Sequence, residues 1–251
     1  MQLVIDGVNK SFNGRTVLDQ IHLTVKPHEL VCILGHSGCG KSTLLNMVAG
    51  FIAPDNGTIT VDGQPIKGPS KQRGVVFQEH ALFPWFNVMD NIAFGPEVQG
   101  MGKKEARNHA AHFLELVGLS DYAKHYPHEL SGGMKQRVGI ARALAAGPDM
   151  LLMDEPFGAL DILTRDVMQR ELLRICREVK PTVLFVTHSI SEAISLGDRV
   201  VVMKHGKIAS VLEVEMTHPR TFHNSRFGQL MTEIEDVLMD EASEEAKEAR
   251  I

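Results

Sequence analysis

The 251-residue sequence contains little cysteine and a single tryptophan. Its three cysteines, Cys32, Cys39 and Cys176, are odd in number and lack the spacing of a metal-binding motif. This argues against a disulfide framework and a zinc ribbon, and it is typical of a chain in a reducing cytosol.

Long hydrophobic runs and an excess of basic residues are also missing. No stretch approaches the ~18 consecutive apolar residues of a membrane-spanning helix, and the N-terminal "MQLVIDGVNK" has neither the basic start nor the apolar core of a signal peptide. The formal net charge is −5, so no basic field favours nucleic acid as a partner. We therefore expect a chain that neither spans a membrane nor is exported.

Apolar runs alternate with helical patterns along most of the chain, and 43% of the residues are hydrophobic, enough for a substantial core. The runs at 30–34, 74–77, 150–154 and 182–187 predict strands buried on both faces of a sheet. Helical patterns at 103–118, 132–147 and 164–179 lie between them. This alternation indicates an α/β fold with a mostly parallel central sheet.

Two further patterns divide the chain. The strands "QLVIDGV" and "IHLTV" flank a turn at Asn13–Gly14, which predicts an N-terminal antiparallel β subdomain, and a second hairpin turns at His205–Gly206. The section from about 79 to 146 is rich in helical patterns and predicts an inserted helical subdomain. We expect one domain over 1–230, followed by an acidic helix or tail at 231–251.

The stretch "LGHSGCGKSTLL" fits the phosphate-loop pattern G-x-x-x-x-G-K-[ST] between a buried strand and a helix. Glycines let several backbone N–H groups converge on a nucleotide's phosphates, and the helix N-terminus adds partial positive charge. Lys41 would neutralise phosphate charge, and the Ser42 hydroxyl would ligate Mg²⁺. The alternative, a glycine-rich turn that binds nothing, is disfavoured because motif and context agree. The expected nucleotide-binding residues are Gly35, His36, Ser37, Gly38, Cys39, Gly40, Lys41, Ser42 and Thr43.

A second acidic motif, "MLLMDEP", ends an apolar strand with Asp154 and Glu155. Open α/β sheets bind ligands at the carboxyl ends of their strands. Asp154 is expected to hold Mg²⁺ largely through water, and Glu155 to accept a proton from an attacking water as general base. On its own the pair would be an ordinary capping turn, but downstream of a phosphate loop it indicates nucleotide hydrolysis.

The stretch "ELSGGMKQRVGIARAL" resembles the signature motif of ATP-binding-cassette (ABC) ATPases. Ser131, Gly132 and Gly133 open a predicted helix and offer N–H donors and a hydroxyl to an anion. An ordinary helix cap followed by flexible glycines is the alternative for this stretch alone. The resemblance extends over nearly all of residues 1–230 and implies ATP and Mg²⁺ as cofactors.

The resemblance assigns further roles. Gln78 matches the Q-loop glutamine that reaches Mg²⁺, Asp161 ends the D-loop "GALD", and His188 matches the switch histidine that contacts the γ-phosphate. Lys41 and Glu155 complete the implied catalytic set with Gln78 and His188. The pattern Ser189-x-x-Glu192 predicts a capping box that holds the turn after His188.

Phe12 matches the place where the family stacks an aromatic ring on adenine, and Val17 is counted with the nucleotide-binding residues. Tyrosine is common at the first of these positions, but stacking needs only a π-face. A role for Phe12 in the protein core is the alternative.

In this family two cassettes pair head to tail, and each ATP lies between one phosphate loop and the partner's signature. The resemblance therefore implies a homodimer in which Ser131, Gly132 and Gly133 serve the partner's nucleotide. ATP binding would join the pair and hydrolysis would release it.

The segment "QEHALFPWFNVMDNIAFG", Gln78–Gly95, resembles most closely the ATPases of nitrate, sulfonate and taurine-type importers. In importer ATPases this region receives a coupling helix of the membrane subunit, although its aromatic residues could instead fill the core of the helical subdomain. The resemblance implies permease partners, a periplasmic or extracellular solute-binding protein, and a peripheral location at the cytoplasmic face of the inner membrane.

A soluble ABC ATPase with a mechanical or regulatory role is the alternative function. Such proteins usually have a long coiled-coil insertion or two cassettes in tandem, and this compact sequence shows neither.

Two local expectations remain. In the acidic C-terminal segment, Met231, Ile234 and Leu238 give a short apolar stripe, which favours a solvated, partly frayed helix over an autoregulatory or partner contact. Cys39 lies near a helix N-terminus and Lys41, a position expected to favour its thiolate form. The alternative is a side chain that faces away from the nucleotide and takes no part in binding.

Overall fold

The computed structural model describes residues 1–78, 81–221 and 223–239 of this chain. The chain forms two compact units. Unit 1 joins Met1–Gly68 to the C-terminal part of the chain from Leu184 onward, and unit 2 comprises Pro69–Val183. Among the described helices, none is long and apolar enough to cross a membrane.

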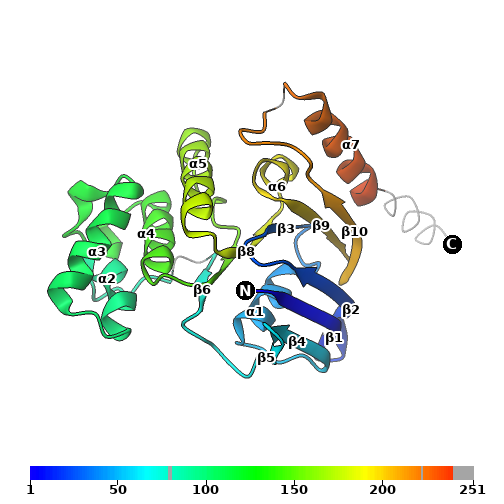
Figure 1. Ribbon diagram of the computed structural model, residues 1–251, viewed down its shortest axis with the longest axis horizontal. Helices are drawn as coiled ribbons and strands as arrows, with labels where there is room; N and C mark the ends of the chain where they lie inside the picture. Colours follow the sequence, from blue (N-terminus) through cyan, green and yellow to red (C-terminus); the bar gives the residue numbers. More distant parts are fainter. Residues whose placement is uncertain (79–80, 222, 240–251) are drawn as a thin grey trace. The chain divides into compact units, whose positions relative to one another are not determined.

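Unit 1 contains the predicted N-terminal antiparallel sheet, whose strand order is β2-β1-β4-β5 (Figure 1). Its strands are β1 (Leu3–Phe12), β2 (Arg15–Val25), β4 (Asn56–Val61) and β5 (Gln64–Pro65). Asn13 and Gly14 both have positive φ, 49° and 79°, as a tight hairpin turn requires. The predicted turn and subdomain are therefore confirmed.

Parallel pairing in unit 1 positions the phosphate loop. The buried strand β3 (Leu30–Leu34) runs parallel to β9 (Arg199–Lys204), and β9 pairs antiparallel with β10 (Lys207–Glu213). The turn between β9 and β10 lies at His205–Gly206, as predicted. Helix α1 (Lys41–Ala49) follows the loop after β3 and ends at Gly50, which is left-handed as expected of a C-terminal glycine.

The C-terminal helix α7 (Ser225–Met239) differs from the expected solvated helix. It begins before the acidic segment and buries Phe227, Leu230 and Ile234, each at most 1% exposed. It packs against α6 (Ile190–Leu196) and β9, and Figure 1 shows α7 beside α6. Of the predicted stripe, Ile234 is buried whereas Met231 and Leu238 are half-buried, so the helix packs on unit 1 through Phe227, Leu230 and Ile234. Residues 240–251, with most of the acidic groups of the tail, lie outside the described residues.

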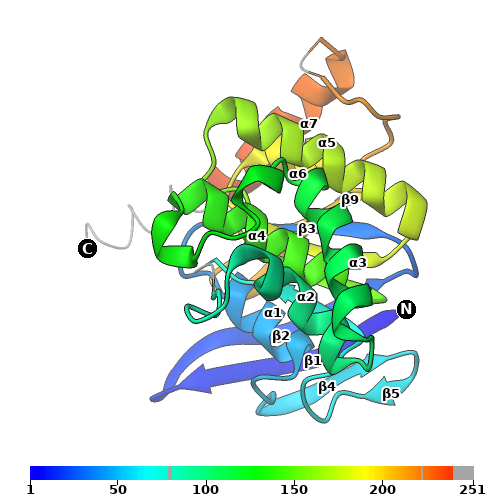
Figure 2. The same ribbon diagram turned by 90° about the vertical axis from the view of Figure 1, so that its left-hand side faces the viewer.

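Unit 2 holds the predicted inserted helices between two parallel strands, β6 (Arg73–Val76) and β7 (Met150–Asp154). Helices α2 (Val88–Val98), α3 (Lys103–Leu116) and α4 (Gly132–Ala145) pack on one another, and two 3-10 turns, Ser120–Tyr122 and Pro127–Glu129, join α3 to α4 (Figure 2). The described part of 79–146 contains no strand, in agreement with an inserted helical subdomain, whose bounds stay a prediction because Glu79 itself is not among the described residues.

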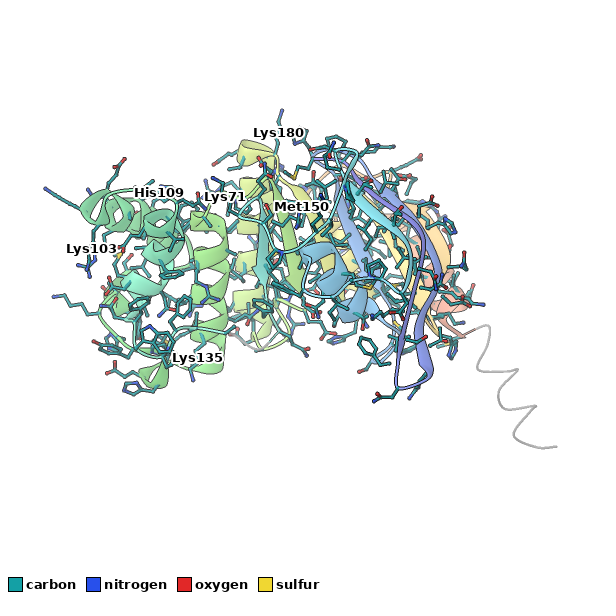
Figure 3. The ribbon with its side chains drawn as sticks, turned by 90° about the horizontal axis from the view of Figure 1, so that it is seen from below. Lys71, Lys103, His109, Lys135, Met150 and Lys180 are labelled. Carbon is teal, nitrogen blue, oxygen red and sulfur yellow. The ribbon has the colours of Figure 1, made fainter. Side chains whose placement is uncertain are left out.

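The rest of unit 2 leads back toward unit 1. After β7 comes helix α5 (Ile162–Val179), with Lys180 as its C-cap. The next strand, β8 (Thr182–Thr187), contains the boundary between the two units along the sequence. Figure 3 labels His109, whose Nε2 lies 3.0 Å from the carbonyl oxygen of Ala145 and so links α3 to the last turn of α4. The helices of unit 2 are thus joined by polar contacts as well as by apolar packing.

The burial of α7 predicts a measurable contribution to stability. Leu230→Ala removes a fully buried side chain and should lower the free energy of unfolding by about 3 kcal/mol in urea titrations, because it leaves a cavity. Met239→Ala, on the same helix but 68% exposed, is the matched control and should change stability by less than about 0.5 kcal/mol. Equal, small effects of both substitutions would contradict a docked α7.

Candidate functional site

The phosphate loop connects the end of β3 to the start of α1 in unit 1. Gly40 has φ 102°, and its carbonyl oxygen accepts the first intrahelical hydrogen bond, from Leu44 N at 2.9 Å. Within the described residues, no side chain caps the N-terminus of α1, and its first turn has no acidic residue. The helix therefore presents backbone donors and partial positive charge where the motif places phosphate.

Lys41 places its charge inside this loop. The side chain is only 5% exposed, and its Nζ donates hydrogen bonds to the carbonyl oxygens of Gly35 and His36, both at 2.8 Å. A buried ammonium needs such partners, because an unpaired charge in the interior is costly. The loop is therefore wrapped around the ammonium group that the sequence assigned to phosphate binding.

Two loop glycines are required by the protein's own backbone. A Cβ atom on Gly35 would lie 2.3 Å from the carbonyl oxygen of Met203 in β9, and one on Gly40 would lie 2.8 Å from that of Val17 in β2. The sequence explained these glycines by the approach of phosphate. The structure adds that β2 and β9 press on the loop from the protein side, so each glycine also has a packing role.

A pocket of about 660 Å³ adjoins the loop within unit 1. Its lining combines the loop residues His36–Cys39, the β2 residues Arg15–Val17, the β9–β10 turn from Met203 to Gly206, and Leu238 of α7. Val17 thus lies at the same pocket as the loop. Sequence reasoning missed the contributions of the turn and of α7, which are distant along the chain and match no motif.

Phe12 is not among the residues that line this pocket. It is the last residue of β1, is 43% exposed, and has the Nζ of Lys10 5.4 Å from its ring centroid. This exposure removes the alternative of a core residue. Stacking of Phe12 on adenine stays a prediction.

Cys39 does not have the environment expected from the sequence. It is 8% exposed, and burial raises the pKa of its thiol even though the nearby Lys41 ammonium acts to lower it. The thiolate form is therefore disfavoured, and the expectation of a reactive cysteine is wrong. The loss of water around the thiol raises its pKa more than the helix N-terminus lowers it, because the Sγ atom packs against Gly35. A Cβ atom on Gly35 would lie only 2.7 Å from this Sγ.

His188 follows β8 in unit 1, and its side chain is exposed. The turn after it is held differently from the predicted capping box. Ser189 Oγ accepts from the Glu192 N–H at 3.3 Å, but the Glu192 carboxylate accepts from the Thr187 hydroxyl. The Ser189 N–H instead donates to Thr187 Oγ1 at 3.0 Å. Half of the box is present, and Thr187 replaces the other half.

Unit 2 carries the acidic motif at the end of β7. Asp154 is the last residue of the strand and is 9% exposed. Glu155 has φ 44°, a left-handed backbone that costs energy in a residue other than glycine. Such conformations cluster at functional sites, where they aim a side chain that regular structure would not aim.

Unit 2 also brings the signature motif and the D-loop together. Ser131 caps α4 by accepting from the Met134 N–H at 3.3 Å. A Cβ on Gly133 would lie 3.3 Å from Leu160 Cδ2, so the start of α4 packs closely on the segment that ends at Asp161. Sequence reasoning treated the two motifs as separate.

Asp161 is the N-cap of α5. Its side chain accepts from the Thr164 N–H at 3.0 Å, and hydrogen bonds to Thr164 lower the pKa of the carboxyl. Asp161 therefore stays ionised at neutral pH, where its charge favours the N-terminus of this helix.

Gln78 follows β6, which ends at Val76, one residue before the end of the predicted strand at 74–77. Its side chain is exposed, and the next two residues lie outside the described part of the chain.

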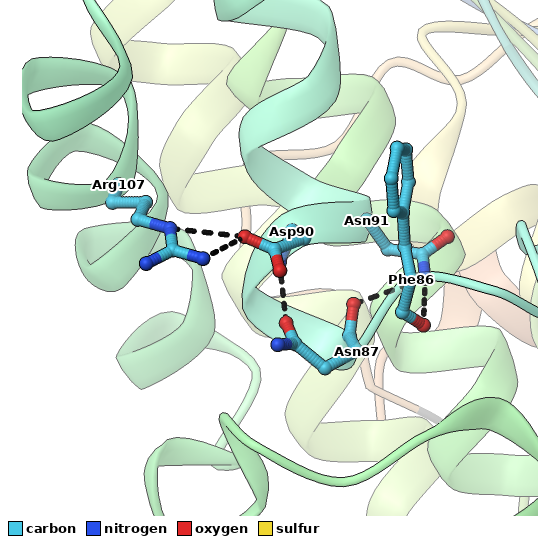
Figure 4. Close-up of polar contacts among 5 residues, drawn as sticks. All are labelled: Phe86, Asn87, Asp90, Asn91 and Arg107. Carbon is cyan, nitrogen blue, oxygen red and sulfur yellow. Dashed lines mark hydrogen bonds and ion pairs between the residues drawn. The ribbon is translucent and has the colours of Figure 1, made fainter.

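The aromatic segment that starts α2 is held by a polar network (Figure 4). Asn91 is fully buried, and its side-chain amide donates to the carbonyl oxygens of Phe83, Phe86 and Asn87 at 3.0–3.1 Å. Its Oδ1 accepts from the Phe83 N–H at 2.9 Å. Sequence reasoning missed Asn91, although a lone amide within an apolar helical stretch is a usable signal.

A second contact in Figure 4 anchors the same helix. Asn87 caps α2 by accepting from the Asp90 N–H at 2.8 Å, and the guanidinium of Arg107 on α3 pairs with the Asp90 carboxylate. In the same segment Trp85 is 68% exposed and Phe94 is 36% exposed. The aromatic residues thus divide between the subdomain's own packing and its surface.

The packing of Gly35 predicts the effect of adding one methyl group. Gly35→Ala should displace the loop, because the new Cβ would meet the Met203 carbonyl oxygen at 2.3 Å, and we expect at least a tenfold loss of ATP affinity by calorimetry. Gly68→Ala is the matched control, since no atom lies within 4 Å of its added Cβ. Wild-type affinity in Gly35→Ala would show that the loop relaxes freely.

Comparison with known proteins places these features in one family. The sequence model of a family described as "ABC transporter" matches residues 18–158. A nitrate import ATP-binding protein of Synechococcus elongatus is 46% identical over 249 residues, which cover 94% of this chain and 91% of that protein. A taurine import ATP-binding protein of Ruegeria pomeroyi is 48% identical over 206 residues, covering 80% and 77%.

A solved structure agrees with this placement. The dimeric post-hydrolysis state of an ATP-binding cassette bound to ADP and Pi has a TM-score of 0.80 and 31% identity, covering 86% of this chain and all of that one. Motifs, fold and relatives agree, and this chain belongs to the ABC transporter family as one of its ATP-binding, ATP-hydrolysing cassettes.

Proposed function

We propose that this chain is the motor subunit of an importer of small solutes. The observation that carries the proposal is the phosphate loop folded around the buried Lys41 ammonium, next to an uncapped helix N-terminus. Three phosphates need this concentration of donors and positive charge. Relatives whose names state nitrate or taurine import support a nitrate-, sulfonate- or taurine-like anion as the solute.

Hydrolysis requires a base and a charge-balancing cation. Glu155 is the proposed general base, with His188 at the γ-phosphate. Ser42, Gln78 and Asp154 are the proposed Mg²⁺ ligands, an all-oxygen donor set that suits this hard cation. Mg²⁺ would supply neutralisation of the charge that develops on the phosphates.

The signature motif supports a head-to-tail homodimer. Ser131, Gly132 and Gly133 open α4 with a hydroxyl and backbone donors, and we infer that they complete the partner copy's ATP site. A dimeric cassette with ADP and Pi among the similar structures supports this arrangement. ATP would then stabilise the pair, and its hydrolysis would release it.

The aromatic surface at Gln78–Gly95 is the proposed contact with the permease. Trp85 and Phe94 are exposed on a segment that Asn91 holds rigidly, and exposed aromatic residues on a rigid base are typical of interface anchors. The chain would then act peripherally at the cytoplasmic face of the inner membrane, in a system that includes a solute-binding protein outside it.

The role of Glu155 gives a direct test of the ATPase mechanism. Glu155→Gln should retain ATP binding but lose roughly 100-fold or more in turnover, because the amide cannot accept the proton of the attacking water. Size-exclusion chromatography with ATP should then show a trapped dimer. Near-wild-type hydrolysis by this variant would refute the assignment of the base, and a trapped species that stays monomeric would refute the shared site.

The permease contact is tested separately from hydrolysis. Trp85→Ala should weaken co-purification with the permease by at least about tenfold, as for an aromatic interface anchor, while the ATPase rate of the isolated subunit stays unchanged. Val179→Ala, which removes an exposed apolar side chain on α5 (63% exposed), is the control and should bind normally. Undiminished assembly of Trp85→Ala would place the permease contact elsewhere.

A further inference from the structure

We propose that the C-terminal helix α7 forms a wall of the nucleotide pocket, and that Leu238 contacts the bound nucleotide and couples the docking of α7 to nucleotide affinity. This inference rests on the proposed function, in that the phosphate loop must bind ATP. It assigns Leu238 a role that none of the nucleotide motifs covers.

The pocket itself supplies the first observation. Leu238 lines the same cavity of about 660 Å³ as the loop residues His36–Cys39 and as Val17. A cavity of this size accommodates more than a row of phosphates and falls within the usual range for small-molecule sites. A nucleoside is the part of ATP that would extend beyond the loop toward Leu238.

The side chains that line the pocket agree with phosphates at the loop and a nucleoside near Leu238. Arg15, His36, Lys204 and His205 supply basic groups, whereas Val17 and Leu238 supply apolar ones. Phosphates are bound by charge and N–H donors, and a ribose or base gains more from apolar contact. Leu238 is therefore suited to the nucleoside end of the ligand.

The second observation is that α7 is fixed to the rest of unit 1 by buried side chains and by a hydrogen bond. The helix buries its own Phe227, Leu230 and Ile234, and the Nζ of Lys204 donates to the carbonyl oxygen of Val237 at 2.8 Å. A cation at the last turn of a helix also interacts favourably with the helix dipole. The last turn of α7, which carries Leu238, is thus held by the burial of Ile234 and by the hydrogen bond from Lys204.

The third observation connects this anchor to the phosphate loop. Lys204 directly follows Met203, whose carbonyl oxygen leaves no space for a Cβ on Gly35. In the turn after Lys204, the carbonyl oxygen of Gly206 accepts a hydrogen bond from the Asp19 N–H at 2.8 Å. A Cβ on Gly206 would lie 2.5 Å from the carbonyl oxygen of Val17, so this turn packs directly on β2. Movement of the end of α7 would therefore act on the loop and on Val17 through a short, closely packed turn.

Thermodynamic linkage follows from this geometry. If the nucleotide contacts docked α7 more favourably than undocked α7, each must stabilise the other by the same factor. ATP and ADP should both report the effect, because they share the nucleoside. Tripolyphosphate, which lacks a nucleoside, should not.

Calorimetric titration of the full chain tests the contact. Leu238→Ala should bind ATP and ADP about fivefold more weakly than wild type, as expected for the loss of a partly exposed apolar contact, and should bind tripolyphosphate unchanged. Leu238→Met should restore most of the affinity. Met239→Ala is the matched control, since Met239 is the neighbouring residue, is 68% exposed and does not line the pocket.

Hydrogen exchange tests the coupling from the other side. Saturating ADP should slow exchange of the amides in the last turn of α7 in the wild type, and by several-fold less in Leu238→Ala. This readout reports docking of the helix, so it separates a lost nucleotide contact from a helix that the substitution has simply detached.

The outcomes divide cleanly. If Leu238→Ala binds both nucleotides as the wild type does, or if Met239→Ala weakens binding equally, the inference is wrong while the proposed function stands. A parallel loss of tripolyphosphate affinity would mean that the substitution disturbs the loop, and it would also overturn a nucleoside contact. Failure of the wild type to bind ATP would overturn the proposed function together with the inference.

Discussion

The close approach of β2 and β9 to the phosphate loop is the constraint on which the rest of unit 1 depends. The carbonyl oxygens of Val17 and Met203 occupy the space that side chains on Gly40 and Gly35 would need. The backbone is thereby forced into a tight curve whose own carbonyl groups, at Gly35 and His36, hold the Lys41 ammonium. The curve of the loop therefore follows from packed backbone together with the hydrogen bonds of Lys41, and the proposed phosphate site is built on it.

The same constraint explains why the pKa of the Cys39 thiol is raised although its sequence position suggests that the thiolate is favoured. A helix N-terminus and a lysine both favour a thiolate, but the Sγ atom is turned toward Gly35 and away from water. Burial disfavours the charged form more than these groups favour it. The loop thus presents an uncapped helix N-terminus while it keeps the Cys39 thiol 8% exposed.

Two helices begin at glycine-containing motifs, and their N-termini differ in whether a side chain caps them. Helix α1 starts at Gly40 with no capping side chain among the described residues, whereas α4 starts at Ser131, whose hydroxyl caps the Met134 N–H. A free N-terminus suits a ligand bound within the same chain. A capped one keeps its shape without the ligand, which suits the proposed role of Ser131 at a partner's nucleotide.

The sequence by itself determined the local elements and the chemical motifs. The bounds of β7, β8 and the β9–β10 turn were predictable because continuous apolar runs and the His205–Gly206 pair are local signals. The proposed site residues 35–43 and the acidic pair Asp154 and Glu155 also come from local signals, since each motif is contiguous.

Only the tertiary structure decided which distant residues share a surface. It brought Leu238 to the pocket of the phosphate loop, turned Asn91 inward to hold the aromatic segment, and replaced half of the expected capping box with Thr187. It also packed α7 on unit 1 through Phe227, Leu230 and Ile234, of which the predicted stripe contained only Ile234. These outcomes depend on packing between segments far apart along the chain, and neither residue periodicity nor motif spacing encodes such contacts.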